Sequence, residues 1–108
     1  MEDFNRSILF YDMEIHEVID AKLIKNYTIE FVFDDLSRGQ VDLKKYLGRG
    51  IFKDLLSPRL FKQFQVDAEL GTITWFNGAD IAPETLYAEV QKHKKKILFN
   101  RKLKIGNG

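Results

Sequence analysis

The histidines and the adjacent acids are the first residues of this 108-residue chain that could do chemistry. His16 and His93 are its only histidines, and neither has a neighbour at the spacing of a metal ligand set. The pair Asp34-Asp35 could bind a divalent cation, but two acids at the end of a predicted strand are more typical of a turn. The residues alone therefore predict no metal site and no cofactor.

Nucleophilic catalysis has equally little support. The chain contains no cysteine, which excludes a thiolate nucleophile, a disulfide and a cysteine zinc site. Ser7, Ser37 and Ser57 do not lie in a Gly-x-Ser-x-Gly elbow, and Ser57 is explained as the N-cap of a helix that Pro58 opens. We expect no catalytic residue, so the chain is not expected to be an enzyme.

The segment Asn77-Gly78-Ala79-Asp80 has the most suggestive pattern. A tight turn after an aromatic strand, followed by an acid and a helix that begins with proline, could present Asp80 and backbone amides to a small anion. An enzyme or anion-binding protein that uses Asn77–Glu84 is one alternative. The turn and the satisfaction of amides at the helix entrance explain the same residues without a ligand.

An aromatic pair precedes that turn. Because neighbouring strand residues point to opposite faces, one of Trp75 and Phe76 is expected in the core and the other at a surface, where it could anchor a partner. The candidate contacts for a ligand or partner are Trp75, Asn77, Gly78, Asp80 and Tyr87.

The charges are unevenly distributed. Residues 1–91 carry ten Lys/Arg and sixteen Asp/Glu, whereas residues 92–108 carry seven basic residues and no acid. A basic tail could bind nucleic acid or an anionic membrane surface, or it could be a solvated helix end, and the acidic body would oppose the binding of a polyanion. The candidate nucleic-acid contacts are Lys92, Lys94, Lys95, Lys96, Arg101, Lys102 and Lys104.

Strands must position most of these residues. Strict alternation in 27–34, with Tyr27, Ile29, Phe31 and Phe33 on one face, predicts a half-buried strand. Strands expected at about 15–24 and 39–43 flank it with tight turns, which predicts a three-stranded antiparallel meander.

The rest of the chain alternates short helices with one hairpin. Helical turns are expected at 44–47 and 51–56, a brief helix from Pro58, and a hairpin of 65–67 with 72–76 around Gly71. A last helix should begin at Pro83. The predicted fold is α+β: a small antiparallel sheet (the meander plus the later hairpin), short helices and a C-terminal helix.

The length favours one domain, at 15–91, with an N-terminal extension at 1–14 and a basic C-terminal tail at 92–108. No apolar run approaches the ~20 residues of a membrane span. The N-terminus lacks the basic and then apolar order of a signal peptide. We expect a cytoplasmic protein without a membrane span.

Several segments together resemble a known family. Those segments are 27–35, 41–43, 71–75 and, above all, 77–87, which begins Asn77-Gly78-Ala79-Asp80-Ile81-Ala82-Pro83. Over about residues 15–90 the chain is similar to the bacterial family called domain of unknown function 2442.

The resemblance implies a small α+β protein without an established activity. Some relatives append a helix-turn-helix domain, and some are thought to be antitoxin-like partners of a small second protein. This chain departs from the pattern at Leu36, where relatives commonly have glycine after the acids, and the residues after Val90 are too few for a helix-turn-helix unit.

The preferred hypothesis is therefore a non-enzymatic protein-interaction or regulatory module, with an antitoxin-like role as its specific form. Its contact would be an exposed strand edge or an aromatic patch, and its partner another small protein or a second copy of the chain. Nucleic-acid binding through the basic tail and an enzyme acting at Asn77–Glu84 are the alternatives.

Overall fold

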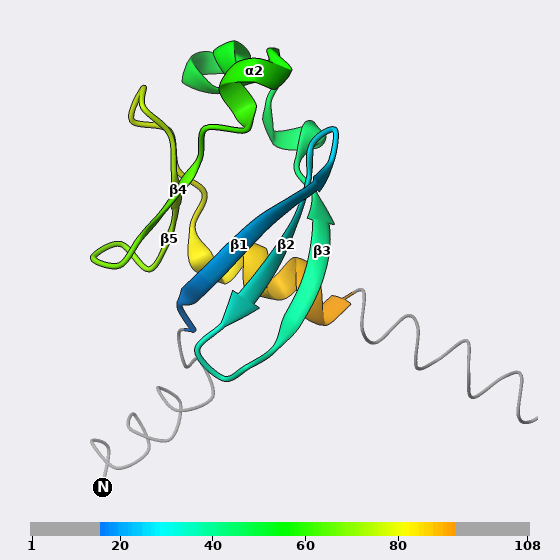
Figure 1. Cartoon of the computed structure of the whole chain (residues 1–108), viewed down its shortest axis with the longest axis vertical. Coiled ribbons are helices and arrows are strands. Elements are labelled where there is room, and N and C mark those ends of the chain that lie inside the picture. The colour runs from blue at the N-terminus through cyan, green and yellow to red at the C-terminus, as the bar shows by residue number, and fades with distance from the viewer. Residues whose placement is uncertain (1–15, 93–108) are drawn as a thin grey trace, which may run out of the picture.

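The computed structural model describes residues 16–92 of the chain. It contains a three-stranded antiparallel sheet, a two-stranded hairpin and short helices (Figure 1). In chain order the elements are β1 (Val18–Lys25), β2 (Thr28–Phe33), β3 (Arg38–Asp42), the 3-10 helices η1 (Lys44–Tyr46) and η2 (Gly50–Leu56), α2 (Pro58–Phe61), β4 (Gln65–Asp67) and β5 (Thr72–Thr74), followed by the C-terminal helix, 83–92. The predicted α+β fold is confirmed.

The alternation in β2 produces the buried face of the sheet. Ile29, Phe31 and Phe33 are fully buried, and the residues between them are half-buried. In the register, Phe31 lies opposite Ala21 on β1 and Gly39 on β3. The sheet order is β1-β2-β3, so the predicted meander is confirmed.

The C-terminal helix covers that buried face and lies behind the sheet in Figure 1. It begins at Pro83, as predicted, and packs Leu86 and Val90 into the core. A Cβ atom on Gly39 would lie 2.8 Å from Val90 Cγ1, which is closer than carbon atoms approach without displacement. The absence of a side chain at position 39 therefore lets the helix sit close to β3.

The helical segment forms the other end of the core. Leu55 and Phe61 are fully buried, and the Phe61 ring lies 5.7 Å from that of Trp75. Ser57 stands at the N-cap of α2, but its side chain makes no capping hydrogen bond. Its carbonyl oxygen instead accepts hydrogen bonds from the N–H groups of Leu60 and Phe61. The proline signal was therefore correct, whereas the expected role of the Ser57 hydroxyl was wrong.

The β4–β5 hairpin attaches to the start of β1. The N–H of Val18 donates to the carbonyl of Gly71, which has a φ of 68° as its place in a tight turn requires. The strand after Gly71 ends at Thr74, two residues earlier than predicted. The hydroxyl of Thr72, the buried polar side chain of this region, donates to the carbonyl of Ile81. Among the helices of residues 16–92, none has the length and apolar character needed to cross a membrane.

Candidate functional site

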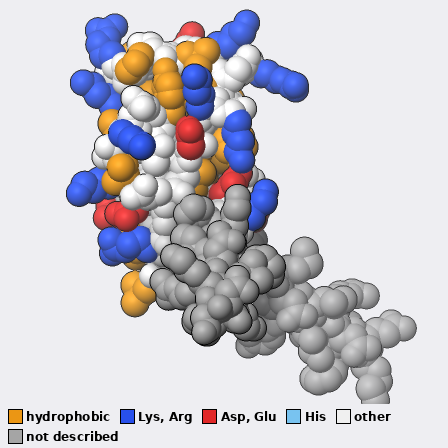
Figure 2. Space-filling model, turned by 90° about the vertical axis from the view of Figure 1, so that its right-hand side faces the viewer, with side chains coloured by type: hydrophobic (Ala, Val, Ile, Leu, Met, Phe, Trp, Pro, Cys, Tyr) orange, Lys and Arg blue, Asp and Glu red, His pale blue; other side chains and the backbone are white. Residues whose placement is uncertain are grey.

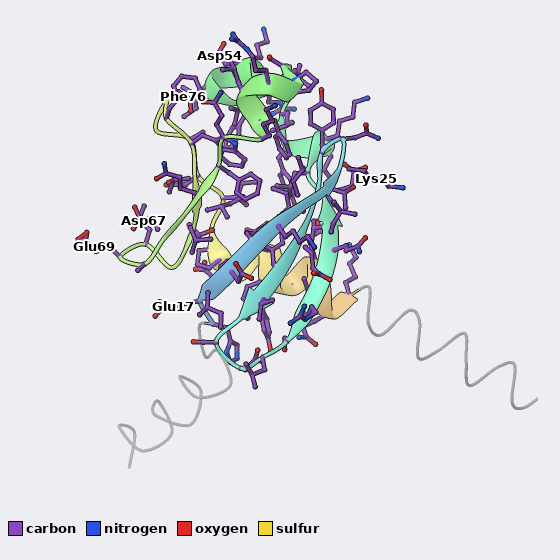
Figure 3. The ribbon with its side chains drawn as sticks, in the orientation of Figure 1. Glu17, Lys25, Asp54, Asp67, Glu69 and Phe76 are labelled. Atoms are coloured by element: carbon purple, nitrogen blue, oxygen red, sulfur yellow. The ribbon has the colours of Figure 1, made fainter. Side chains whose placement is uncertain are left out.

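A cluster of polar side chains lies at the end of the sheet where β1 begins and the β2–β3 turn closes. His16 Nδ1 is 3.0 Å from Asp34 Oδ1 and 3.8 Å from Asp35 Oδ2. The N–H of Asp34 donates to the carbonyl of Glu17, which joins the two segments through the backbone. Glu17 is labelled in Figure 3 and marks this end of the molecule. We call His16, Asp34, Asp35 and Tyr87 the His16 cluster.

Tyr87 brings the C-terminal helix into the His16 cluster. Its hydroxyl donates to Asp35 Oδ2 at 2.7 Å, and its ring stacks on the His16 ring with a centroid distance of 4.4 Å. The same ring packs nearly perpendicular to Phe33 in the core, at a centroid distance of 5.1 Å. Tyr87, a predicted contact residue, therefore contacts His16 before β1 and Asp35 in the β2–β3 turn.

The Asp35 carboxylate is held in its charged form. Burial by itself would raise the pKa of this carboxyl, but hydrogen bonds from Tyr87 and Ser37 lower the pKa to about 2. The hydrogen bond between Tyr87 and Asp35 also raises the pKa of the Tyr87 hydroxyl, because the carboxylate stabilises the protonated hydroxyl that donates to it. One Asp35 oxygen also accepts the N–H of Ser37, so the turn role that the sequence predicted for this acid is confirmed.

No local sequence pattern indicates that these groups meet, because His16 and Asp34 are 18 positions apart. The signal was available in the hairpin register. Val18 pairs with Phe33, so continuing the two strands places residues 16 and 17 beside residues 34 and 35. Together His16, Asp34 and Asp35 offer one ring nitrogen and two carboxylate oxygens, all within 4.8 Å of one another.

The segment around Asn77 forms a second feature, at the opposite end of the molecule. Trp75 is only 4% exposed, and its indole N–H donates to the carbonyl of Phe61 at 2.8 Å. It therefore belongs to the core and is not the surface aromatic, which corrects its place among the candidate contacts. Phe76, its neighbour, is 64% exposed.

Asn77 fixes the position of this loop. Its side-chain amide donates to the carbonyl of Ile51 at 2.8 Å, and its side-chain oxygen accepts the N–H of Ala79 at 3.1 Å. Gly78 has a φ of 86°, the left-handed conformation expected for the turn. The loop is thus tied to η2, a contact that sequence reasoning did not predict.

Asp80 does not join either feature. It is exposed and forms an isolated antiparallel bridge with Thr74, which pairs the end of β5 with the segment that leads to the C-terminal helix. The Asn77–Glu84 segment therefore splits: its first half supports the loop at η2, and its second half leads into the C-terminal helix. A hollow of about 410 Å³ lies on that helix and is lined by Glu84, Thr85, Ala88, Glu89 and Lys92.

Most of the basic tail lies outside the residues that the structure describes. Lys92 is exposed at the last described position. The remaining candidate nucleic-acid contacts lie outside the described residues: Lys94, Lys95, Lys96, Arg101, Lys102 and Lys104.

A second hollow lies beside Phe76. Its volume is about 460 Å³, and its lining combines two aromatic side chains of the Asn77 loop with residues that follow α2. The lining residues are Gln63, Phe64, Gln65, Thr74, Trp75 and Phe76. An exposed aromatic ring beside a hollow is the kind of surface at which one protein can anchor on another.

Comparison with known proteins identifies the family. No curated protein and no solved structure gives a significant match. The family model described as "protein of unknown function (DUF2442)" matches residues 18–92, which include β1, the Asn77 loop and the C-terminal helix. Since this match covers well over half of the 108 residues, the chain belongs to the DUF2442 family.

Proposed function

We propose that this chain is a non-enzymatic protein-interaction module whose contact surface is centred on Phe76. The observation that carries the proposal is the 64% exposure of this ring on a loop that is otherwise well packed. Ile51, on the η2 segment that Asn77 holds, is 52% exposed. The hydrogen bond from Asn77 to the Ile51 carbonyl brings the segments of these two exposed apolar residues together, and exposed apolar side chains that gather in this way mark binding sites.

The support beneath this surface is rigid. Trp75 precedes Phe76 and is locked by its hydrogen bond to Phe61 and by its edge-on contact with Phe52, at a centroid distance of 6.5 Å. Asn77 follows and is bonded to both η2 and its own turn. Because the backbone on both sides of Phe76 is held in place before binding, the loop loses little conformational entropy when a partner binds.

The charges around the helical segment indicate the partner's chemistry. Between residues 49 and 62 the exposed charged residues are four basic and one acidic: Arg49, Lys53, Arg59, Lys62 and Asp54. Figure 2 shows the right-hand side of the molecule as seen in Figure 1, away from Phe76, and there too Lys and Arg side chains surround apolar side chains in the upper part. Figure 3 places Asp54 and Phe76 at the same end of the molecule. We therefore expect a partner with an apolar anchor and acidic flanks.

The strand edge is a weaker candidate for the contact. β3 is the last strand of the sheet among the described residues, but it is short. Its exposed side chains are polar or charged at Arg38, Gln40 and Asp42. Such an edge resists strand addition.

An antitoxin-like role is the specific form that we propose, with a small second protein as the partner. A second copy of this chain is the alternative occupant, and light scattering of the purified chain distinguishes the two. A cytoplasmic location goes with the proposal, and fractionation of the native host tests it.

The test is quantitative co-purification from the native host with the full chain as bait. The variant Phe76→Ser removes the anchor, and Leu70→Ser is the matched control, because Leu70 is 54% exposed on the distant β4–β5 turn. We expect one protein whose recovery falls roughly tenfold or more with Phe76→Ser and is unchanged with Leu70→Ser. Equal recovery with all three baits would refute the proposed contact.

Nucleic-acid binding through the basic tail gives a different result in the same experiment. Recovery would then depend on nuclease treatment, fall steeply with salt and be lost when residues 93–108 are deleted. Phe76→Ser would have little effect. An enzyme acting at Asn77–Glu84 would instead show turnover that Asp80→Asn removes.

A further inference from the structure

The His16 cluster contains a donor set that the proposed interaction does not use. An imidazole nitrogen and two carboxylates come from two segments of the chain, the residues before β1 and the β2–β3 turn. Imidazole and carboxylate are both common ligands of divalent transition metals such as Zn²⁺ and Co²⁺. Phe76 and Glu17 lie at opposite ends of the molecule in Figure 3, so this cluster is separate from the Phe76 surface.

The separations match those of a coordination sphere. Metal–nitrogen and metal–oxygen bonds of about 2.1 Å in tetrahedral geometry place neighbouring ligand atoms roughly 3.4 Å apart. His16 Nδ1 lies 3.0 Å from one carboxylate oxygen and 3.8 Å from the other, on either side of that value. Small side-chain rotations would therefore admit an ion between the three groups.

The supporting contacts leave the ligand atoms available. Asp35 Oδ1 accepts the N–H of Ser37, and Asp35 Oδ2 accepts the hydroxyl of Tyr87, so the carboxylate is oriented while Oδ2 keeps one lone pair. The Tyr87 ring stacks on His16 and fixes the plane of the imidazole. Such contacts behind the ligands are typical of metal sites, because they hold the ligand atoms in position.

We propose that His16, Asp34 and Asp35 bind one divalent transition-metal ion, with water in the remaining position. The side chains are 17%, 44% and 30% exposed, so the ion would have a route from solvent. Coordination uses a lone pair on His16 Nδ1, so any proton on that nitrogen leaves as the ion enters.

A purely structural role for the cluster makes a different prediction. His16 and Asp34 would then only fasten the start of β1 to the β2–β3 turn. Their removal would lower the free energy of unfolding, and Zn²⁺ would have no effect on the wild-type chain. Metal binding and stability must therefore be measured separately.

The experiment uses the untagged full chain, freed of metal by a chelator and dialysed. Calorimetric titration with ZnCl₂, with MgCl₂ as the comparison ion, should show one Zn²⁺ per chain and much weaker Mg²⁺ binding. His16→Ala and Asp34→Asn should each weaken Zn²⁺ binding at least tenfold. His93→Ala and Asp80→Asn are the matched controls, and they should bind as the wild type does.

Tyr87→Phe tests the positioning residue. The ring and its packing on Phe33 remain, while the bond to Asp35 is lost, so Zn²⁺ affinity should fall roughly 10-fold to 100-fold. Bound Co²⁺ gives a visible absorption that reports its ligand geometry, and the spectrum should change in Tyr87→Phe. No Zn²⁺ binding by the wild type, or equal binding by His16→Ala, would overturn the proposal even where co-purification succeeds.

Discussion

At the scale of single residues, two side chains show how local conformation and charge are set by neighbours. Leu36 has a φ of 70°, in the left-handed region that a bulky side chain rarely occupies. It follows the acids of the β2–β3 turn, where the N–H of Leu36 donates to the carbonyl of Phe33. The turn therefore needs a conformation that glycine adopts without strain.

Leu36→Gly should stabilise the chain. The side chain is 76% exposed, so little burial is lost, and a left-handed non-glycine residue costs about 1–2 kcal/mol. Glycine also loses more backbone entropy on folding, so we expect a net gain of about 1 kcal/mol. Denaturant unfolding measures it, and Leu36→Ala is the control, which removes the exposed side chain but keeps the strain. A gain for alanine equal to that for glycine would contradict this explanation.

Glu89 connects the C-terminal helix to η1. It accepts the hydroxyl of Tyr46 at 2.6 Å and forms an ion pair with Lys45. Hydrogen bonds from Lys45 and Tyr46 lower the pKa of Glu89 below its usual 4.5. Burial and the bond to Glu89 raise the pKa of Tyr46 to about 12.

These contacts predict a pH-dependent contribution to stability. Because the folded pKa of Glu89 is depressed, its contribution is complete above pH 4.5 and is lost as the pH falls through the lower folded value. Glu89→Gln should lower the free energy of unfolding by roughly 1 kcal/mol at pH 7 and have little effect at the acid end. Glu69→Gln, an exposed acid on the β4–β5 turn, is the control. A difference from wild type that stays constant with pH would contradict the assignment.

At the scale of elements, the sheet and the helix that covers it depend on one close approach. Val90 of the C-terminal helix packs directly against Gly39 of β3. Gly39 in turn lies opposite Phe31 in the strand register. Neither Val90 nor Gly39 has a polar side chain, so this contact depends on shape alone. Packed interiors tolerate additional atoms poorly because their neighbours have few places to move.

Gly39→Ala should therefore destabilise the chain. The new Cβ would lie 2.8 Å from Val90 Cγ1, and moving the helix or β3 should cost about 1–3 kcal/mol. Gly48→Ala is the matched control, because a Cβ there meets no atom within 4 Å. Thermal unfolding of both variants measures the difference. Equal melting temperatures for Gly39→Ala and wild type would show that the helix does not pack as described.

The elements themselves could largely be predicted from sequence, since their signals are local. Alternation in residues 27–33 and the proline at position 83 place a strand and a helix start without knowledge of the rest of the fold. The orientation of Trp75 and Phe76 could not be decided in this way, because β5 ends at Thr74 and the pair lies in the turn. Trp75 is the buried residue of the two because its ring packs against Phe61, which is distant in the chain.

The His16 cluster escaped prediction for the same reason. Its members come from the chain before β1, the β2–β3 turn and the C-terminal helix, and only the folded sheet brings them together. Each one taken singly has an ordinary explanation as a surface or turn residue. A site whose residues come from three separate segments can be predicted from the sequence only after the strand register is known.

At the scale of the whole molecule, the hydrophobic core and the proposed contact surface occupy different places. The hydrophobic core runs from the sheet and its helix to the helical segment around Leu55 and Phe61. Phe76 stands outside that core on a loop that is held by its neighbours. A solvent-exposed aromatic ring contributes little to the free energy of unfolding. Removing the Phe76 ring should therefore affect binding more than stability.

The most direct test of the Phe76 contact measures unfolding and partner recovery on the same Phe76→Ser preparation. We predict a free energy of unfolding within about 0.5 kcal/mol of the wild type, together with the loss of a partner that Leu70→Ser still recovers. A Phe76→Ser chain that folds normally and recovers every protein that the wild type recovers would contradict the account.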